Sequence, residues 1–237
     1  MKGKSDNSFR ARMGRAKEFL TYISGFENYK PPRPEENVES MGAIINELID
    51  IMSNVASLND LHKAAMNVRL DAFYEKDDSV QKLLVQIRAA IDALYGKTSQ
   101  QATVVGKIIR DMRNVKVRKE KVDINNEVSV ESVGRSEKSY GSVTFFFHEI
   151  LATIQNYQDY ATSNDRVSKE SLKQTAEKLV AINGDVNKKY QDLDAARELR
   201  ETRYIEFRNR TQRIKAYVRG QYGLNSKEYN LIRGLRF

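Results

Sequence analysis

The two histidines, His62 and His148, are the residues best suited to acid–base or metal chemistry. A carboxylate-bridged di-metal site in a helical bundle needs Glu-x-x-His on two helices, because residues three apart share a helix face. Asn59 and Phe145 stand three residues before these histidines, so neither completes the motif. The chain has no cysteine, which excludes zinc–thiolate sites and cysteine nucleophiles. We therefore predict a non-enzymatic protein with no catalytic residues, metal or cofactor.

Basic residues are concentrated near the end of the sequence. The chain has 40 Lys and Arg against 32 Asp and Glu, a net charge of +8. Residues 200–237 contain ten basic and three acidic side chains, and the segments 1–17 and 107–121 are also basic. The remainder is therefore acidic. The candidate anion-binding residues are Arg208, Arg210, Arg213, Lys215 and Arg219.

This uneven charge has several interpretations. A basic face of one subunit can meet the acidic body of another, and such contacts form filaments or large rings when they do not close. Interleaved arginines and aromatic rings are also typical of proteins that bind single-stranded nucleic acid. A third interpretation is that the basic residues only lie on solvent-exposed helix faces and bind no partner. The candidate interface residues are Tyr222, Tyr229, Phe237, Arg233 and Arg236.

We expect a structural or scaffolding protein that forms a homo-oligomer through complementary basic and acidic surfaces, with nucleic-acid binding as the alternative. No small-molecule substrate is indicated. No apolar run approaches the length of about 18 residues needed to span a membrane, and the basic start of the chain lacks the apolar stretch of a signal peptide. We expect a cytoplasmic protein and no membrane partner.

An internal repeat indicates how the chain is organised. The element Tyr95-Gly-Lys-Thr-Ser99 resembles Tyr222-Gly-Leu-Asn-Ser226 at a sequence offset of 127. Upstream, residues 26–29 resemble residues 154–157 at an offset of 128. We predict two tandem helical repeats, residues 9–112 and 138–237. They follow a basic tail at residues 1–8 and are separated by a charged linker or small β-hairpin at residues 113–137, whose turn would fall at Asn125-Asn126.

Long helices are expected because the chain has no proline after residue 34. Each repeat should form a first helix (10–29 and 140–160), a second helix (35–56 and 168–182) and then a break (57–60 and 183–185). A long third helix follows, with a heptad-like apolar seam over residues 186–218. Gly96 and Gly223 should end it, and Thr98 and Asn225 should cap a short fourth helix. The predicted fold is an all-α, elongated antiparallel bundle.

Overall fold

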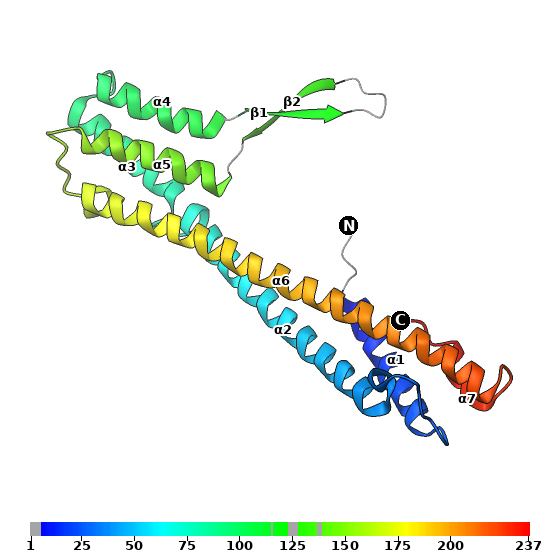
Figure 1. Ribbon diagram of the computed structural model, residues 1–237. Coiled ribbons are helices and arrows are strands. Elements are labelled where there is room, and N and C mark those ends of the chain that lie inside the picture. Colours follow the sequence, from blue (N-terminus) through cyan, green and yellow to red (C-terminus); the bar gives the residue numbers. More distant parts are fainter. Residues whose placement is uncertain (1–5, 115, 123–127, 137–138) are drawn as a thin grey trace. The chain divides into compact units, whose positions relative to one another are not determined.

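The computed structural model describes the backbone of residues 6–114, 116–122, 128–136 and 139–237, and the side chains of residues 9–112 and 139–237. Helices make up most of this structure (Figure 1), which confirms the predicted all-α class. Within the described residues, no helix is both long enough and apolar enough to cross a membrane. The α-helices are α1 (Asp6–Ser24), α2 (Val38–Leu70), α3 (Val80–Tyr95), α4 (Gln100–Asn114), α5 (Tyr140–Gln155), α6 (Lys169–Tyr222) and α7 (Lys227–Arg233).

Shorter elements connect these helices. The 3-10 helices η1 (Pro34–Glu36) and η3 (Asp165–Val167) precede α2 and α6, and the π-helix η2 (Asp71–Glu75) follows α2. Strands β1 (Lys116–Val122) and β2 (Val128–Ser136) pair antiparallel between α4 and α5. They occupy the segment for which the sequence leaves a linker or a hairpin open. The turn expected at Asn125-Asn126 and the side chains of the basic tail lie outside the described residues.

The two predicted helix breaks are wrong. Helix α2 continues through residues 57–60, and α6 continues through residues 183–185. The apolar face does not change register at these points, since Leu179 and Val186 are both buried. The Asn183 amide donates to the Thr144 hydroxyl at 3.0 Å rather than ending the helix. A single glycine inside a helix costs only about 1 kcal/mol, which packing of the continuous face offsets.

The predicted seam of α6 is buried over most of its length. Arg200 interrupts the apolar pattern, and its guanidinium carbon lies 4.2 Å from the centre of the Phe9 ring. Tyr190, near the start of the seam, is half exposed. The buried seam residues are Val186, Leu193, Arg200, Tyr204, Phe207, Thr211, Ile214 and Val218.

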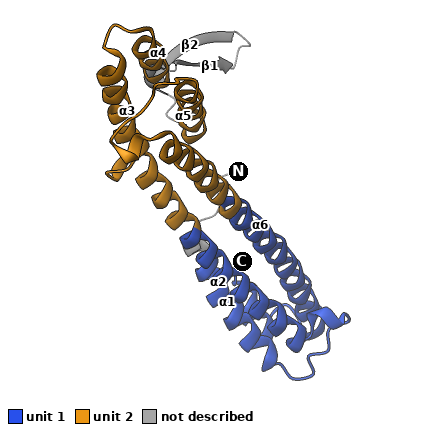
Figure 2. Ribbon diagram, turned by 90° about the vertical axis from the view of Figure 1, so that its left-hand side faces the viewer, with its two compact units in different colours: residues 1–61, 190–237 blue, residues 62–189 orange. Residues whose placement is uncertain are grey.

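The chain divides into two compact units (Figure 2). Unit 1 comprises residues 1–61 and 190–237, and unit 2 comprises residues 62–189. In unit 1, α1 and the first part of α2 pack against the last part of α6 and α7. In unit 2, η2, α3 and α4 pack against α5 and the first part of α6. Each unit therefore combines the early part of one predicted repeat with the late part of the other.

Hydrogen bonds recur in the two units at a constant sequence offset of 131. The Tyr29 hydroxyl donates to the Glu36 carbonyl oxygen at 2.8 Å, and the Tyr160 hydroxyl donates to the Val167 carbonyl oxygen at 2.7 Å. In both units this bond ties the end of the first helix to the 3-10 turn that precedes the long helix. The loop that reverses the chain is therefore held in the same way twice.

Ring contacts recur at the same offset. The Phe9 and Tyr204 rings meet edge to face with centroids 5.4 Å apart, and the Tyr140 and Phe73 rings do so at 5.0 Å. An arginine guanidinium also lies over one ring of each pair. The matching residues of unit 1 and unit 2 are Phe9 and Tyr140, Tyr204 and Phe73, and Arg200 and Arg69.

The observed offset corrects the sequence alignment of the first helices. The Phe26 amide donates to the Ile23 carbonyl, and the Tyr157 amide donates to the Ile154 carbonyl. Phe26 thus corresponds to Tyr157 at an offset of 131, not to Ile154 at 128. A shift of three residues is close to one helical turn, so it leaves the apolar face nearly unchanged. Periodicity alone therefore does not distinguish the two alignments.

The glycines of the repeated Tyr-Gly element end their helices as predicted. Gly96 has φ 86° and Gly223 has φ 100°, a left-handed region that favours glycine. At the Tyr-Gly element the matching residues are 127 apart, not 131. The segment 38–95, from the start of α2 to the end of α3, is therefore four residues longer than its counterpart α6. The extra residues fall between Phe73 and Val80. We call two positions equivalent when their sequence numbers differ by 131, for positions up to Phe73, or by 127, from Val80 onward.

The caps of the fourth helices lie one residue later than predicted. Ser99 precedes α4 and Ser226 precedes α7, and each side-chain oxygen accepts a hydrogen bond from the backbone N–H three residues later, at 3.1 Å. Thr98 and Asn225 precede these caps. The serines match the N-cap preference for a short side chain that accepts a hydrogen bond.

Candidate functional site

The predicted interface aromatics pack against the core of unit 1. The Tyr222 hydroxyl donates to the Glu27 carbonyl oxygen at 2.7 Å. The Phe237 ring meets the Phe19 ring edge to face at 5.6 Å. Tyr229 is half-buried against the same core. The structure therefore brings the three residues into one cluster, where they contribute to folding of the chain itself.

Two of the predicted anion-binding arginines have partners within unit 1. Arg210 donates to the Glu35 carbonyl oxygen at 3.0 Å and forms an ion pair with Glu206. Arg213 forms an ion pair with Glu36, whose side chain is 2% exposed. Hydrogen bonds from neighbouring arginines, Arg210 among them, hold the pKa of the Glu206 carboxyl below its usual range. These arginines neutralise acids of their own chain.

The other predicted basic residues are more accessible, with one exception. Lys215 is half-buried and donates to the Leu235 carbonyl oxygen, and burial lowers the pKa of its ammonium group. The C-terminal segment that Lys215 contacts includes Phe237, whose ring lies 5.5 Å from its nitrogen. The exposed basic residues are Arg208, Arg219, Arg233 and Arg236.

The positive charges of three arginines of α1 and α6 act on the Tyr204 hydroxyl, and we call these residues the arginine cluster: Arg12, Arg15 and Arg208. The Arg12 guanidinium carbon lies 5.1 Å from the centre of the Tyr204 ring. Burial raises the pKa of the Tyr204 hydroxyl, and the positive charges of the cluster partly oppose that rise. The sequence places Arg208 in the basic segment, but only the fold brings α1 beside it.

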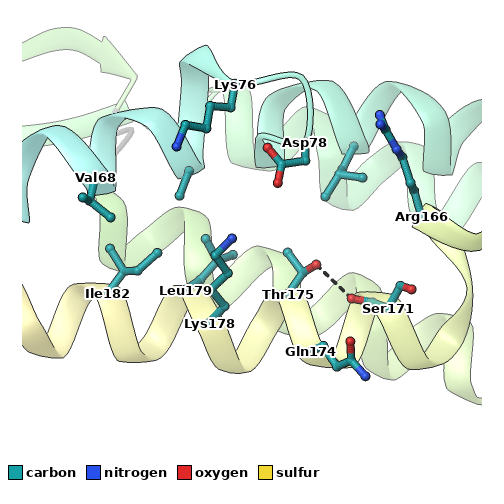
Figure 3. Close-up of a pocket in the computed structure, with 12 residues that line it drawn as sticks. Val68, Lys76, Asp78, Arg166, Ser171, Gln174, Thr175, Lys178, Leu179 and Ile182 are labelled. Atoms are coloured by element: carbon teal, nitrogen blue, oxygen red, sulfur yellow. Dashed lines mark hydrogen bonds between the residues drawn. The ribbon is translucent and has the colours of Figure 1, made fainter.

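A crevice of about 340 Å³ lies in unit 2 (Figure 3). Its walls come from the end of α2, the turn after η2, the start of α3, η3 and the first part of α6. Part of the lining is apolar, with Leu83 and Leu179 buried and Ile182 half-buried. The apolar lining residues are Val68, Ala72, Leu83, Leu179 and Ile182.

The charged lining of the crevice is mainly basic. Lys76, Arg166 and Lys178 line it together with one acid, Asp78. All four are exposed. The Lys76 ammonium also lies 3.3 Å from a carboxylate oxygen of Asp71. The hydroxyl of Thr175 donates to the Ser171 carbonyl oxygen of its own helix, as Figure 3 shows.

The histidines have no place in either region. His62 is half-buried on α2 and His148 is exposed on α5. Across the part of the chain that the structure describes, no group of three or more His, Asp or Glu side chains is arranged to hold a metal ion. Exposed basic residues therefore gather at two places, the end of unit 1 and the crevice of unit 2.

No family model, curated protein or solved structure matches this chain.

The sequence predicts the basic segment of unit 1 but not the crevice. The crevice combines residues from 68–83 with residues from 166–182, and these belong to different predicted repeats. The sequence alignment gives offsets of 128 and 127, which differ by only one residue. The difference of four residues, in the turn that contributes Lys76 and Asp78, appears only when the structure aligns Phe26 with Tyr157.

Proposed function

We propose that the chain is a non-enzymatic structural protein that self-associates through complementary basic and acidic surfaces in the cytoplasm. The separation of exposed charges along the unit 1 part of α6 carries this proposal. Asp192, Asp194 and Glu198 are exposed near its start, whereas Arg208 and Arg219 are exposed toward its end. Arg233 and Arg236 extend the basic end. A basic end of one copy can face the acidic stretch of another.

Light scattering of purified protein at low and high salt tests this proposal. We expect a multimer at low salt, with an absorbance ratio at 260 and 280 nm that excludes bound nucleic acid. Reversing Arg219, Arg233 and Arg236 to Glu should give a folded monomer. The matched control reverses exposed lysines of unit 2, Lys107, Lys173 and Lys188, and should remain multimeric. Equal particle sizes for the two triple variants would overturn the proposal.

Point reversals are preferable to truncating residues 229–237. Phe237 contacts the Phe19 ring and Ile232 is fully buried, so truncation would remove core contacts of unit 1 together with the exposed arginines. A smaller particle after truncation would then have two explanations, loss of folding and loss of assembly. The exposed arginines make no such contribution to the core.

Nucleic-acid binding is the second candidate, and the arginine cluster favours it. Arginines that converge from two helices beside aromatic rings provide phosphate contacts with nearby stacking surfaces. Arg208→Ala should weaken binding of a single-stranded oligonucleotide and lower its salt dependence. Arg213→Ala is unsuitable because it would leave the buried Glu36 without its ion-pair partner. A purified monomer that sheds nucleic acid at high salt would support this candidate over assembly.

We also infer that residues 9–112 and 138–237 are two copies of one helical repeat whose halves are exchanged between the units. The recurring hydrogen bonds, ring pairs and left-handed glycines support this inference, because they involve polar atoms as well as apolar periodicity. Such an arrangement is what fusion of two exchanged protomers would produce. Figure 2 shows unit 1 with its two separate chain segments and unit 2 with its one continuous segment.

A further inference from the structure

The crevice of unit 2 has an equivalent hollow in unit 1, and the two have different chemistry. In unit 1 the hollow has a volume of about 250 Å³. The Arg203 guanidinium lies 2.9 Å from a carboxylate oxygen of Glu47 and 2.8 Å from one of Glu206. Arg210 forms a further ion pair with Glu206. The charges lining this hollow are therefore neutralised within the chain.

Unit 2 has different residues at the positions that form this ion-pair network in unit 1. Ala72 is equivalent to Arg203, and Leu83 is equivalent to Arg210, so two arginines become apolar. Lys178 is equivalent to Glu47, so an acid becomes a base. The crevice thus has an apolar lining in place of the arginines and a cation in place of the carboxylate.

Two further changes add positive charge at the crevice. Arg166 is equivalent to Glu35, which is again a reversal of charge. The four extra residues between Phe73 and Val80 give this unit a longer turn, and the turn contributes Lys76 and Asp78 to the lining. Figure 3 shows Lys76, Arg166 and Lys178 around the space, with Ile182 and Leu179 on α6. The longer turn therefore adds a wall to the crevice.

We propose that this crevice binds a small amphiphilic carboxylate, with its headgroup at Arg166 and its aliphatic body against Leu83, Leu179 and Ile182. The volume of about 340 Å³ is within the range of small-molecule sites. At about 30 Å³ for each water-sized group, this volume holds on the order of ten such groups, which is enough for a medium-length aliphatic chain.

The charges also select the type of headgroup. An arginine fork and an ammonium group both bind a carboxylate, the fork with two parallel hydrogen bonds. Asp78 lies in the same lining and would repel a second negative charge. A singly charged carboxylate with one apolar chain satisfies both conditions. This inference does not depend on self-association, since it concerns unit 2 alone.

Isothermal titration calorimetry of the full chain with decanoate tests the site. We expect saturable binding of one decanoate per chain. 1-Decanol has the same body without the charge, and inorganic phosphate has charge without a body, so both should bind at least tenfold more weakly. If decanol bound as tightly as decanoate, the proposed contact with the charged headgroup would be wrong. If phosphate bound as tightly as decanoate, the proposed contact with the aliphatic body would be wrong.

Variants taken from unit 1 locate the site. Ala72→Arg with Lys178→Glu restores the residues of the Arg203–Glu47 ion pair and should lower decanoate affinity at least tenfold. Arg166→Glu introduces the residue found at the equivalent position of unit 1, Glu35, so it tests the headgroup contact even if the double variant fails to fold. Lys173→Glu, an exposed change of equal charge on α6 outside the lining, is the matched control. Unchanged affinity in the Arg166 variant would overturn the proposal.

Discussion

At the residue scale, the stability of the fold should depend on pH through Tyr160, which is buried, and Tyr29, which is half-buried, because their hydroxyls hold the two reversing loops. The Tyr160 side chain is 7% exposed, and its hydroxyl donates to the Val167 carbonyl oxygen. Burial, with a smaller contribution from Tyr95, raises the pKa of the Tyr160 hydroxyl to about 12. Burial also raises the pKa of Tyr29, its equivalent in unit 1. Both groups are held in the neutral form that donates a hydrogen bond.

The raised pKa of Tyr160 predicts a loss of stability at high pH. Below pH 10 the tyrosine is neutral in the folded and unfolded chains, so its contribution is fully present. Between pH 10 and about 12 only the unfolded chain ionises, so the free energy of unfolding falls as pH rises. Tyr160→Phe should cost about 1 kcal/mol at pH 7 through the lost hydrogen bond. Urea unfolding at pH 7 to 11 measures both effects.

The variant should also show a weaker decline at high pH, because it no longer has the group that ionises. Tyr190→Phe, at a half-exposed position of α6, is the comparison and should keep the decline of the native chain. The same slope in the Tyr160 variant and the native chain would show that another group controls alkaline unfolding.

The net charge of each segment could be predicted from the sequence, but the partners in the ion pairs could not. The sequence shows the excess of arginine in residues 200–237 directly. It does not show that Arg213 meets Glu36, which is 177 residues away, or that Arg203 meets Glu47. Opposite charges occur throughout the chain, and only the packing of α6 against α2 decides which of them meet. The sequence therefore overestimates how much of the basic segment is free to bind a partner.

At the scale of elements, periodicity predicts the helices better than local breaking signals do. The seam over residues 186–218 is found where the spacing places it, and the glycines of the Tyr-Gly element end their helices. The signals at residues 57–60 and 183–185 are similar in local chemistry but do not end a helix. The difference is that Gly96 and Gly223 have positive φ, whereas Gly184 lies within α6.

Gly184→Ala distinguishes a continuous helix from a turn. A Cβ at Gly184 meets nothing within 4 Å, so alanine should raise the free energy of unfolding by about 0.5–1 kcal/mol through its higher helix propensity. Thermal unfolding followed by circular dichroism measures the change. Gly223→Ala, at positive φ, should shift stability in the opposite direction. Destabilisation by Gly184→Ala would place a turn at residues 183–185.

At the scale of the whole molecule, the two compact units do not follow the bounds of the predicted repeats. Phe9 packs against Tyr204, and Tyr140 packs against Phe73. The sequence predicts the similar segments because matching residues recur along the chain. It does not predict which helices pack together, because several pairings of the same helices would bury the same apolar faces.

A fragment of residues 1–112 should therefore fail to form a stable compact monomer. It lacks the residues of α6 that cover α1 and the residues of α5 that cover α3 and α4. Mixing it with residues 113–237 should restore the helical content of the intact chain in a one-to-one complex. Circular dichroism and light scattering measure these outcomes. A monomeric 1–112 fragment that unfolds cooperatively would contradict the exchange.

The discontinuous make-up of unit 1 has a consequence for protein synthesis. Helix α1 leaves the ribosome first, but its partners on α6 follow only after all of residues 62–189. At about 5–20 residues per second, this delay is on the order of ten seconds. Unit 2 therefore completes its set of residues first, while Phe9, Phe19 and Ile23 of the nascent chain wait for a surface to cover them. During that interval these apolar side chains lack the surface of α6 that covers them in the folded unit.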